Sequence, residues 1–259
     1  MKNLILIILM FVIISPNTGD VLSGKNFHNS DVKKNQPEVE MKAEKNNSLN
    51  ILEKKIIKKN SIFRNIPKTN QLIINNFLDK YSEKKYFSHI NKISYRKNST
   101  NRGLASSKNI YFDFKKIDTN KEFKRVMIHE MWHIFDLGYL KSKEKKVLSN
   151  FNDWTQKIYA DDPSVEFYSL CFKDEYELNW NCKKEDFASK YWQTDVFEDF
   201  AESFLLYIEN NDSFKLMANE SRIMKKKYNF LKKYFWEINT EKYSWQKTGK
   251  RVWDLTLAY

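Results

Sequence analysis

The chain has 259 residues, of which 41% are hydrophobic and 30% are charged, and its formal net charge is +12. This length suits one full domain with a substantial core or two small domains, and we expect one. The positive charge does not indicate a nucleic-acid-binding protein, because lysine is abundant along the whole chain and no arginine-rich or stacking-aromatic motif concentrates it. We therefore expect a basic, solvated surface and no nucleic-acid partner.

The N-terminal residues are typical of a secretory signal peptide. Lys2 is followed by an uncharged apolar run from Leu4 to Ile14, and polar residues come next. The run is shorter than the roughly 20 residues that a membrane-spanning helix needs. We predict a signal peptide over residues 1–23, a secreted extracellular protein, and no stable membrane insertion after cleavage. An uncleaved membrane anchor is the alternative.

Residues 24–50 are polar and lack a sustained hydrophobic period, which predicts a flexible linker or pro-region. From Ile51 onward, apolar residues at helical spacing predict helices before and after Pro67. Two later stretches look like strands of a small sheet. The first has Ile90, Ile93 and Tyr95, and the second has Ile110, Phe112 and Phe114 in strict alternation. Because glycine and proline are few, we expect a mostly helical domain with a small sheet over residues 51–259.

The five residues from His129 to His133 read HEMWH, which is the spacing of a zinc site. Residues four apart lie on one face of a helix, so His129 and His133 can bind the same Zn²⁺. Glu130 then faces the remaining coordination position, where it can take a proton from the bound water. The chain has only 4 histidines, so chance is a weak explanation for this pattern. Thr119 and Gly138 suit the start and the end of the predicted helix.

A catalytic zinc needs a third protein ligand and one open position. No histidine follows His133, so the third ligand should be a carboxylate, and the amphipathic stretch 195–208 holds the best candidates. Glu198 and Glu202 share one face of this predicted helix. One can bind zinc while the other holds a ligand imidazole in its metal-binding tautomer, although a solvated polar face is the plainer interpretation. Asp136 is a candidate for a similar supporting role, or for an ordinary surface or capping role.

These motifs resemble the catalytic domain of anthrax lethal factor and the related secreted Pro-Pro endopeptidases, a family of zinc metallopeptidases. The resemblance rests on the HExxH motif, on Tyr191 and on the segment that opens at Glu198, and it covers roughly the second half of the chain. It implies that Glu198 is the third zinc ligand, that Glu202 supports the site, and that Tyr191 helps to stabilise the tetrahedral intermediate. It also implies an α+β, zincin-like domain with its sheet beside the zinc-binding helix.

General chemistry supports the role that the resemblance gives to Tyr191, because a phenol can donate a hydrogen bond to the oxygen that becomes negative during hydrolysis. Aromatic packing with Trp192 is the alternative. In zincins generally, the strand before the zinc-binding helix forms the upper rim of the cleft, and we expect the stretch from Ile110 to Phe114 to take that place. An ordinary core strand is the alternative, and the two are compatible.

The stretch from His133 to Glu198 is longer than the family leads us to expect, so an insertion is implied. It holds both cysteines of the chain, Cys171 and Cys182. In an exported protein, an isolated pair separated by a short loop predicts a disulfide.

The sequence thus predicts a secreted zinc metalloendopeptidase of the gluzincin type that acts on a protein or peptide substrate. One alternative is the catalytic component of a host-targeted toxin, which would require a carrier. The other is an inactive zincin-fold binding module.

Overall fold

The computed structural model describes residues 63–81, 85–106, 108–153, 156–238, 240–241 and 251–257. All of them belong to one compact unit, Ile51–Tyr259. The predictions for residues 1–23 and 24–50, and the helix expected from Ile51 to before Pro67, lie largely outside the described residues. Within the described ranges, no helix has both the length and the apolar character needed to cross a bilayer.

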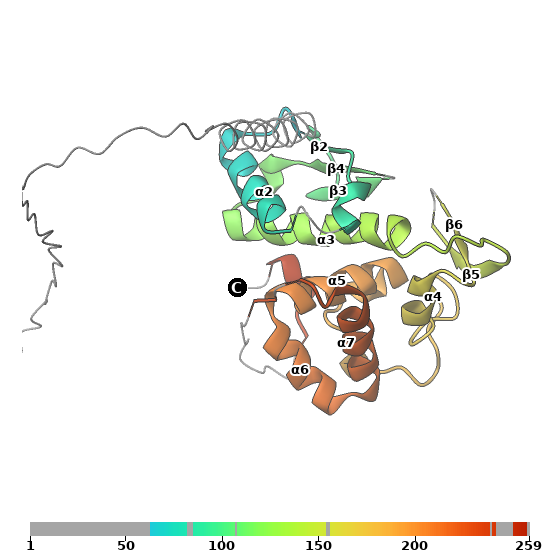
Figure 1. Cartoon of the computed structure of the whole chain (residues 1–259). Helices are drawn as coiled ribbons and strands as arrows, with labels where there is room; N and C mark the ends of the chain where they lie inside the picture. Colours follow the sequence, from blue (N-terminus) through green and yellow to red (C-terminus); the bar gives the residue numbers. More distant parts are fainter. Residues whose placement is uncertain are drawn as a thin grey trace, which may run out of the picture. The chain divides into compact units, whose positions relative to one another are not determined.

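Helices make up most of the described fold, and a small sheet accompanies them (Figure 1). The α-helices are α2 (Lys68–Tyr81), α3 (Asn120–Gly138), α4 (Pro163–Tyr168), α5 (Val196–Glu209), α6 (Asn211–Glu220) and α7 (Arg222–Phe235). The strands are β1 (Phe63–Arg64), β2 (Lys92–Tyr95), β3 (Gly103–Ser106), β4 (Asn109–Phe112), β5 (Leu148–Asn152) and β6 (Lys157–Tyr159). The mixed composition agrees with the predicted α+β class.

The main sheet has the order β1-β2-β4-β3, with β3 antiparallel to β4 and the other pairs parallel. Strands were predicted around Ile93 and Ile110, and β2 and β4 confirm both. Phe114 was expected to continue the second strand, but it begins a short 3₁₀ turn, Phe114–Lys116. The side chain of Asp113 caps this turn by accepting the N–H of Lys115, which ends the extended backbone.

The expectation that the strand immediately before the zinc-binding helix forms the cleft rim is wrong. That strand is β4, and it lies inside the sheet between β2 and β3. The two edge strands are β1 and β3, and β3 is the one that lies against α3 (Figure 1). The short stretch GLAS in β3 has no clear alternation of apolar and polar residues, so sequence periodicity did not reveal it.

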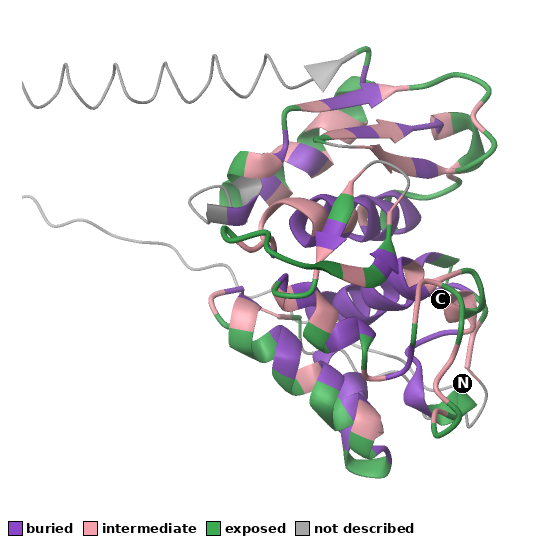
Figure 2. Ribbon diagram, turned by 90° about the vertical axis from the view of Figure 1, so that its right-hand side faces the viewer, coloured by how far each residue is buried: buried purple, intermediate pink, exposed green. Residues whose placement is uncertain are grey.

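Helix α3 is the central element of the fold. It lies between the sheet with α2 on one side and α5 on the other, and Figure 2 shows buried residues concentrated on α3 and α5. Thr119 caps α3 as predicted, because its hydroxyl accepts the N–H of Glu122 at 3.0 Å. Trp132 of α3 stacks on Phe204 of α5 with 4.3 Å between ring centroids and meets Phe200 edge-on. This aromatic packing holds the two helices together.

The predicted disulfide between Cys171 and Cys182 is confirmed. It closes a loop that follows α4, within the stretch that was read as an insertion. The backbone carbonyl of Glu175 in this loop accepts the N–H of Val196, the first residue of α5, at 2.9 Å. The loop is therefore tied to the start of α5.

A buried ion pair joins α7 to α5. Lys227 is fully buried, and its Nζ lies 2.9 and 2.7 Å from the two carboxylate oxygens of Asp199. We expect Lys227→Met to lower the free energy of unfolding by about 3–5 kcal/mol, because it leaves the Asp199 carboxylate buried without a cation. Urea denaturation measures this loss, with Lys226→Met on the exposed face of α7 as the control. Equal stability of the two variants would contradict the prediction.

Candidate metal centre

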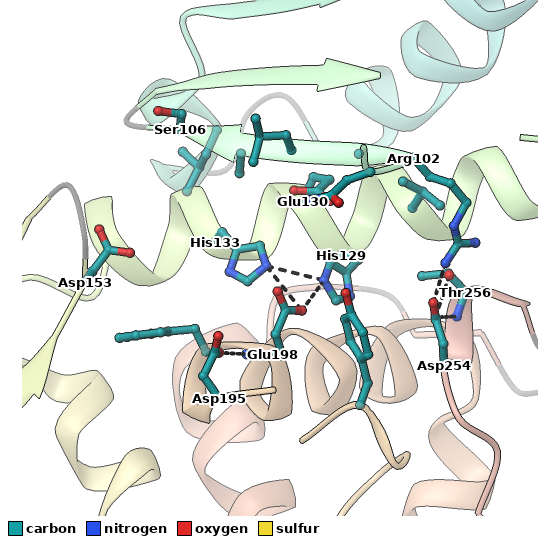
Figure 3. A pocket seen from close by; sticks show the side chains of 18 of the residues that line it. Arg102, Ser106, His129, Glu130, His133, Asp153, Asp195, Glu198, Asp254 and Thr256 are labelled. Atoms are coloured by element: carbon teal, nitrogen blue, oxygen red, sulfur yellow. Dashed lines mark hydrogen bonds and ion pairs between the residues drawn. The ribbon is translucent and has the colours of Figure 1, made fainter. Parts of the chain in front are cut away.

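Two histidines of α3 face one glutamate of α5 (Figure 3). The Nε2 atoms of His129 and His133 lie 3.3 Å apart. Oε2 of Glu198 lies 2.9 Å from Nε2 of His129 and 3.8 Å from Nε2 of His133. Among the described residues, these three form the one group of histidine, cysteine and acidic side chains with ligand atoms close enough to share a metal ion.

These distances fit a zinc ion. Ligand atoms about 2.0 to 2.1 Å from one Zn²⁺ at tetrahedral angles lie about 3.3 Å apart, and the three observed separations bracket that value. Oε2 of Glu198 is buried and its ion-pair contacts are the ring nitrogens of His129 and His133, so the three ligand atoms converge where a bound cation would satisfy all of them. Two imidazoles and one carboxylate also leave one tetrahedral position open, as a catalytic zinc requires.

Glu202 lies one helical turn after Glu198 and contacts His129 at Nδ1, the ring nitrogen that does not face Glu198. Its Oε1 is 3.1 Å from Nδ1 of His129, and its side chain is fully buried. An imidazole that donates its Nδ1 proton to a carboxylate keeps the lone pair of Nε2 for a metal. Helical spacing alone left open which glutamate meets Nε2 of the histidines, and the resemblance gave that place to Glu198; in the structure Glu198 lies there and Glu202 contacts Nδ1 of His129.

The charges around the two histidines favour a cation. Burial lowers the pKa of His129, but the carboxylates of Glu198 and Glu202 outweigh it and raise that pKa well above its ordinary value. Burial lowers the pKa of His133 to about 4, so this imidazole is neutral at pH 7, the form that binds metals. The negative charge that retains a proton on His129 would equally stabilise a divalent ion.

Glu130 has the properties of a general base. It lies on the side of α3 toward β3, whereas His129 and His133 point toward Glu198 (Figure 3). Burial raises the pKa of Glu130 to about 7, although the charge of His129 opposes this effect. A base whose pKa lies near the working pH is efficient in taking up a proton and giving it back.

Gly103 of β3 leaves the space that Glu130 occupies. A Cβ atom at this position would lie 2.5 Å from Oε1 of Glu130 and 2.7 Å from Cγ1 of Val126. We expect Gly103→Ala to displace the Glu130 carboxylate and to lower kcat by about 10²-fold, the scale of a misplaced catalytic group. Peptide-cleavage kinetics test this, and Asn109→Ala on the neighbouring strand β4, which does not line the cleft, is the control. A kcat equal to that of the control would contradict the prediction.

Tyr191 begins a 3₁₀ turn, Tyr191–Gln193, just before α5. Its ring centroid lies 6.1 Å from that of His129. Burial and then the charge of Glu198 raise the pKa of Tyr191, so the phenol keeps its proton and can donate a hydrogen bond. Packing with Trp192 was the alternative role, but Trp192 stacks on Phe187 with 4.3 Å between centroids, and the ring of Tyr191 lies 6.5 Å from that of Trp253. The role of Tyr191 in hydrolysis stays a prediction.

The cap of α5 fixes the direction of Glu198. Oδ1 of Asp195 accepts the N–H of Glu198 at 2.9 Å, which starts the helix one turn before the metal centre. Asp136 is buried, so the ordinary surface role is wrong, and its carboxylate accepts a hydrogen bond from the phenol of Tyr168 in α4. Its supporting role near the metal therefore stays a prediction.

A cleft of about 540 Å³ is lined by His129, Glu130, His133, Tyr191, Asp195 and Glu198. Its walls include residues that sequence reasoning did not select: Arg102, Gly103, Tyr176, Asp254 and Thr256. Tyr176 belongs to the loop closed by the disulfide. Its position in the stretch interpreted as an insertion was the one sequence signal that could have pointed to it. Asp254 lies far beyond the last motif, and no local pattern marks it.

A comparison of the chain with protein-family models, with curated proteins and with solved structures finds no match.

Proposed function

We propose that this chain is a secreted zinc metalloendopeptidase of the gluzincin type with a zincin-like domain. The observation that carries the proposal is the cluster of His129, His133 and Glu198, whose ligand atoms all lie within 4.8 Å of one another. The buried partner Glu202 and the base Glu130 complete the set of groups that such chemistry needs. The motif resemblance to lethal factor-like and Pro-Pro endopeptidase catalytic domains supports the same assignment.

The metal ligands, Glu130 and Tyr191 each have a separate role in the proposed hydrolysis. Zinc held by His129, His133 and Glu198 would supply a Lewis acid that lowers the pKa of a water molecule and polarises a peptide carbonyl. Glu130 takes the proton from the attacking water and delivers it to the nitrogen of the leaving amine. Tyr191 donates a hydrogen bond to the carbonyl oxygen as negative charge develops on it.

The cleft suits an extended peptide. Strand β3 is one edge of the main sheet and forms one wall of the cleft above Glu130 (Figure 3). A substrate strand can pair with such an edge through backbone hydrogen bonds, which place its carbonyl groups at regular spacing. We therefore propose a protein or peptide substrate that binds along β3.

A peptide library tests the function. We expect the purified chain to cleave a subset of peptides, a zinc chelator to abolish cleavage, and added Zn²⁺ to restore it, because the three ligands are the only proposed source of the Lewis acid. Mass spectrometry of the products identifies the cleaved bond. Cleavage that persists in the metal-free protein would contradict the proposal. A chain that binds zinc and cleaves no peptide would instead support the binding module.

A further inference from the structure

We infer that residues 251–257, which we name the C-terminal strap, are part of the metal centre. The backbone N–H of Leu255 positions Glu202, and through Glu202 it holds His129 in the orientation that binds zinc. Leu255 is thus a positioning residue that acts through its main chain. This inference rests on the proposed function.

The first support is the hydrogen bonding of Glu202. One of its oxygens, Oε1, contacts Nδ1 of His129 at 3.1 Å, and the other, Oε2, accepts the N–H of Leu255 at 2.7 Å. Both Glu202 and Leu255 are buried, so water does not readily replace a lost partner. Without the N–H of Leu255, the carboxylate would lose the contact that fixes its rotation, and its hold on His129 would weaken.

The second support is that the strap is anchored on both sides of the metal centre. Asp254 forms an ion pair with Arg102, which directly precedes β3, and Arg102 also contacts Glu122 of α3 at 2.7 Å. On the other side, the carbonyl of Val252 accepts the N–H of Lys190 at 2.8 Å, one residue before Tyr191. The position of Leu255 is therefore fixed by contacts that do not depend on a metal.

The third support is that the strap faces the cleft. Asp254 and Thr256 line it, and Figure 3 shows both beside Arg102 at the end of the cleft next to His129. The ring of Trp253 lies 6.5 Å from that of Tyr191. The strap therefore contacts Glu202, which supports a proposed metal ligand, the proposed oxyanion donor Tyr191, and Arg102 just before β3. These contacts are more than the covering of a hydrophobic core requires.

The decisive experiment removes one N–H group. Replacing Leu255 by its α-hydroxy analogue turns the amide into an ester and keeps the leucine side chain. The matched control places the same ester at Leu257, whose N–H bonds the carbonyl of Asp254 at 3.3 Å and not Glu202. A second variant ends the chain at Lys250 and removes the whole strap. For each protein we measure zinc affinity by competition with a chelator, the Co²⁺ absorption spectrum, and the thermal midpoint of the metal-free form.

We expect the ester at Leu255 to weaken zinc binding by about tenfold and to alter the Co²⁺ spectrum, because loss of a supporting partner typically costs 10- to 100-fold in metal affinity. The ester at Leu257 should leave both unchanged and lower the thermal midpoint only slightly, because Leu257 is exposed and its N–H bond of 3.3 Å is long. The truncated chain should lose at least as much affinity as the Leu255 ester. Equal zinc affinities of the two esters would overturn the inference, even if the truncated chain fails to fold. If the wild-type chain binds no zinc, it is the proposed function that fails.

Discussion

Glu130→Gln is expected to retain about one zinc per chain and to lower kcat/KM by about 10²- to 10⁴-fold, the range that a positioned general base contributes. The glutamine amide has nearly the size of the carboxylate, so the metal ligands on α3 should stay in place. It cannot accept a proton from water at neutral pH. Metal content and peptide-cleavage kinetics of the same preparation test the two halves of this prediction.

The control for this substitution is Glu166→Gln, which changes an exposed glutamate of α4 that pairs with Lys233 at the surface. It should leave both zinc content and kcat/KM near their wild-type values. Full activity in Glu130→Gln would exclude Glu130 as the base. Loss of zinc in Glu130→Gln would instead mean that this carboxylate supports the metal, and the kinetic result could then not be assigned to proton transfer.

The parts of the site that lie on single helices could be predicted from the sequence. The histidines of α3 and the glutamates of α5 are spaced by one turn, so helical periodicity alone shows which side chains share a face. The start of α3 was also predictable, because Thr119 caps it through a contact three residues away. Short-range rules of this kind need no knowledge of the tertiary fold.

The contacts between elements could not be predicted in this way. Periodicity places Glu198 and Glu202 on one face, but only the packing of α5 against α3 decides which of them meets Nε2 of His129 and which meets Nδ1. The edge strand β3 is short and contains Gly103, so it lacks the alternation that reveals a strand. Leu255 reaches Glu202 across 53 positions of sequence, a separation that no local pattern records.

Substituting a proposed zinc ligand should weaken zinc binding more than substituting the residue that supports it. We expect His129→Ala to weaken zinc binding by more than about 100-fold, because it removes a ligand outright and leaves two ligands in place of three. Glu202→Ala keeps all three ligands and removes the partner of Nδ1, together with the acceptor of the Leu255 N–H, so its loss should lie between about 10- and 100-fold. His89→Ala is the matched control, since His89 lies outside the ligand cluster. Elemental mass spectrometry and chelator competition measure the series.

The order of the three variants separates a zinc site from an ion pair that only stabilises the fold. In the metal-free protein, His129 lies between the carboxylates of Glu198 and Glu202, so His129→Ala should also lower the thermal midpoint of that form by leaving both carboxylates without a cation. A purely structural ion pair would produce this destabilisation with no zinc in any protein of the series. A zinc site predicts about one ion per wild-type chain, and a stabilisation of the wild-type chain by added zinc that disappears in His129→Ala. Equal zinc contents in His129→Ala and His89→Ala would therefore contradict the proposed zinc site, and with it the proposed hydrolysis. This conclusion would hold whatever happens to stability.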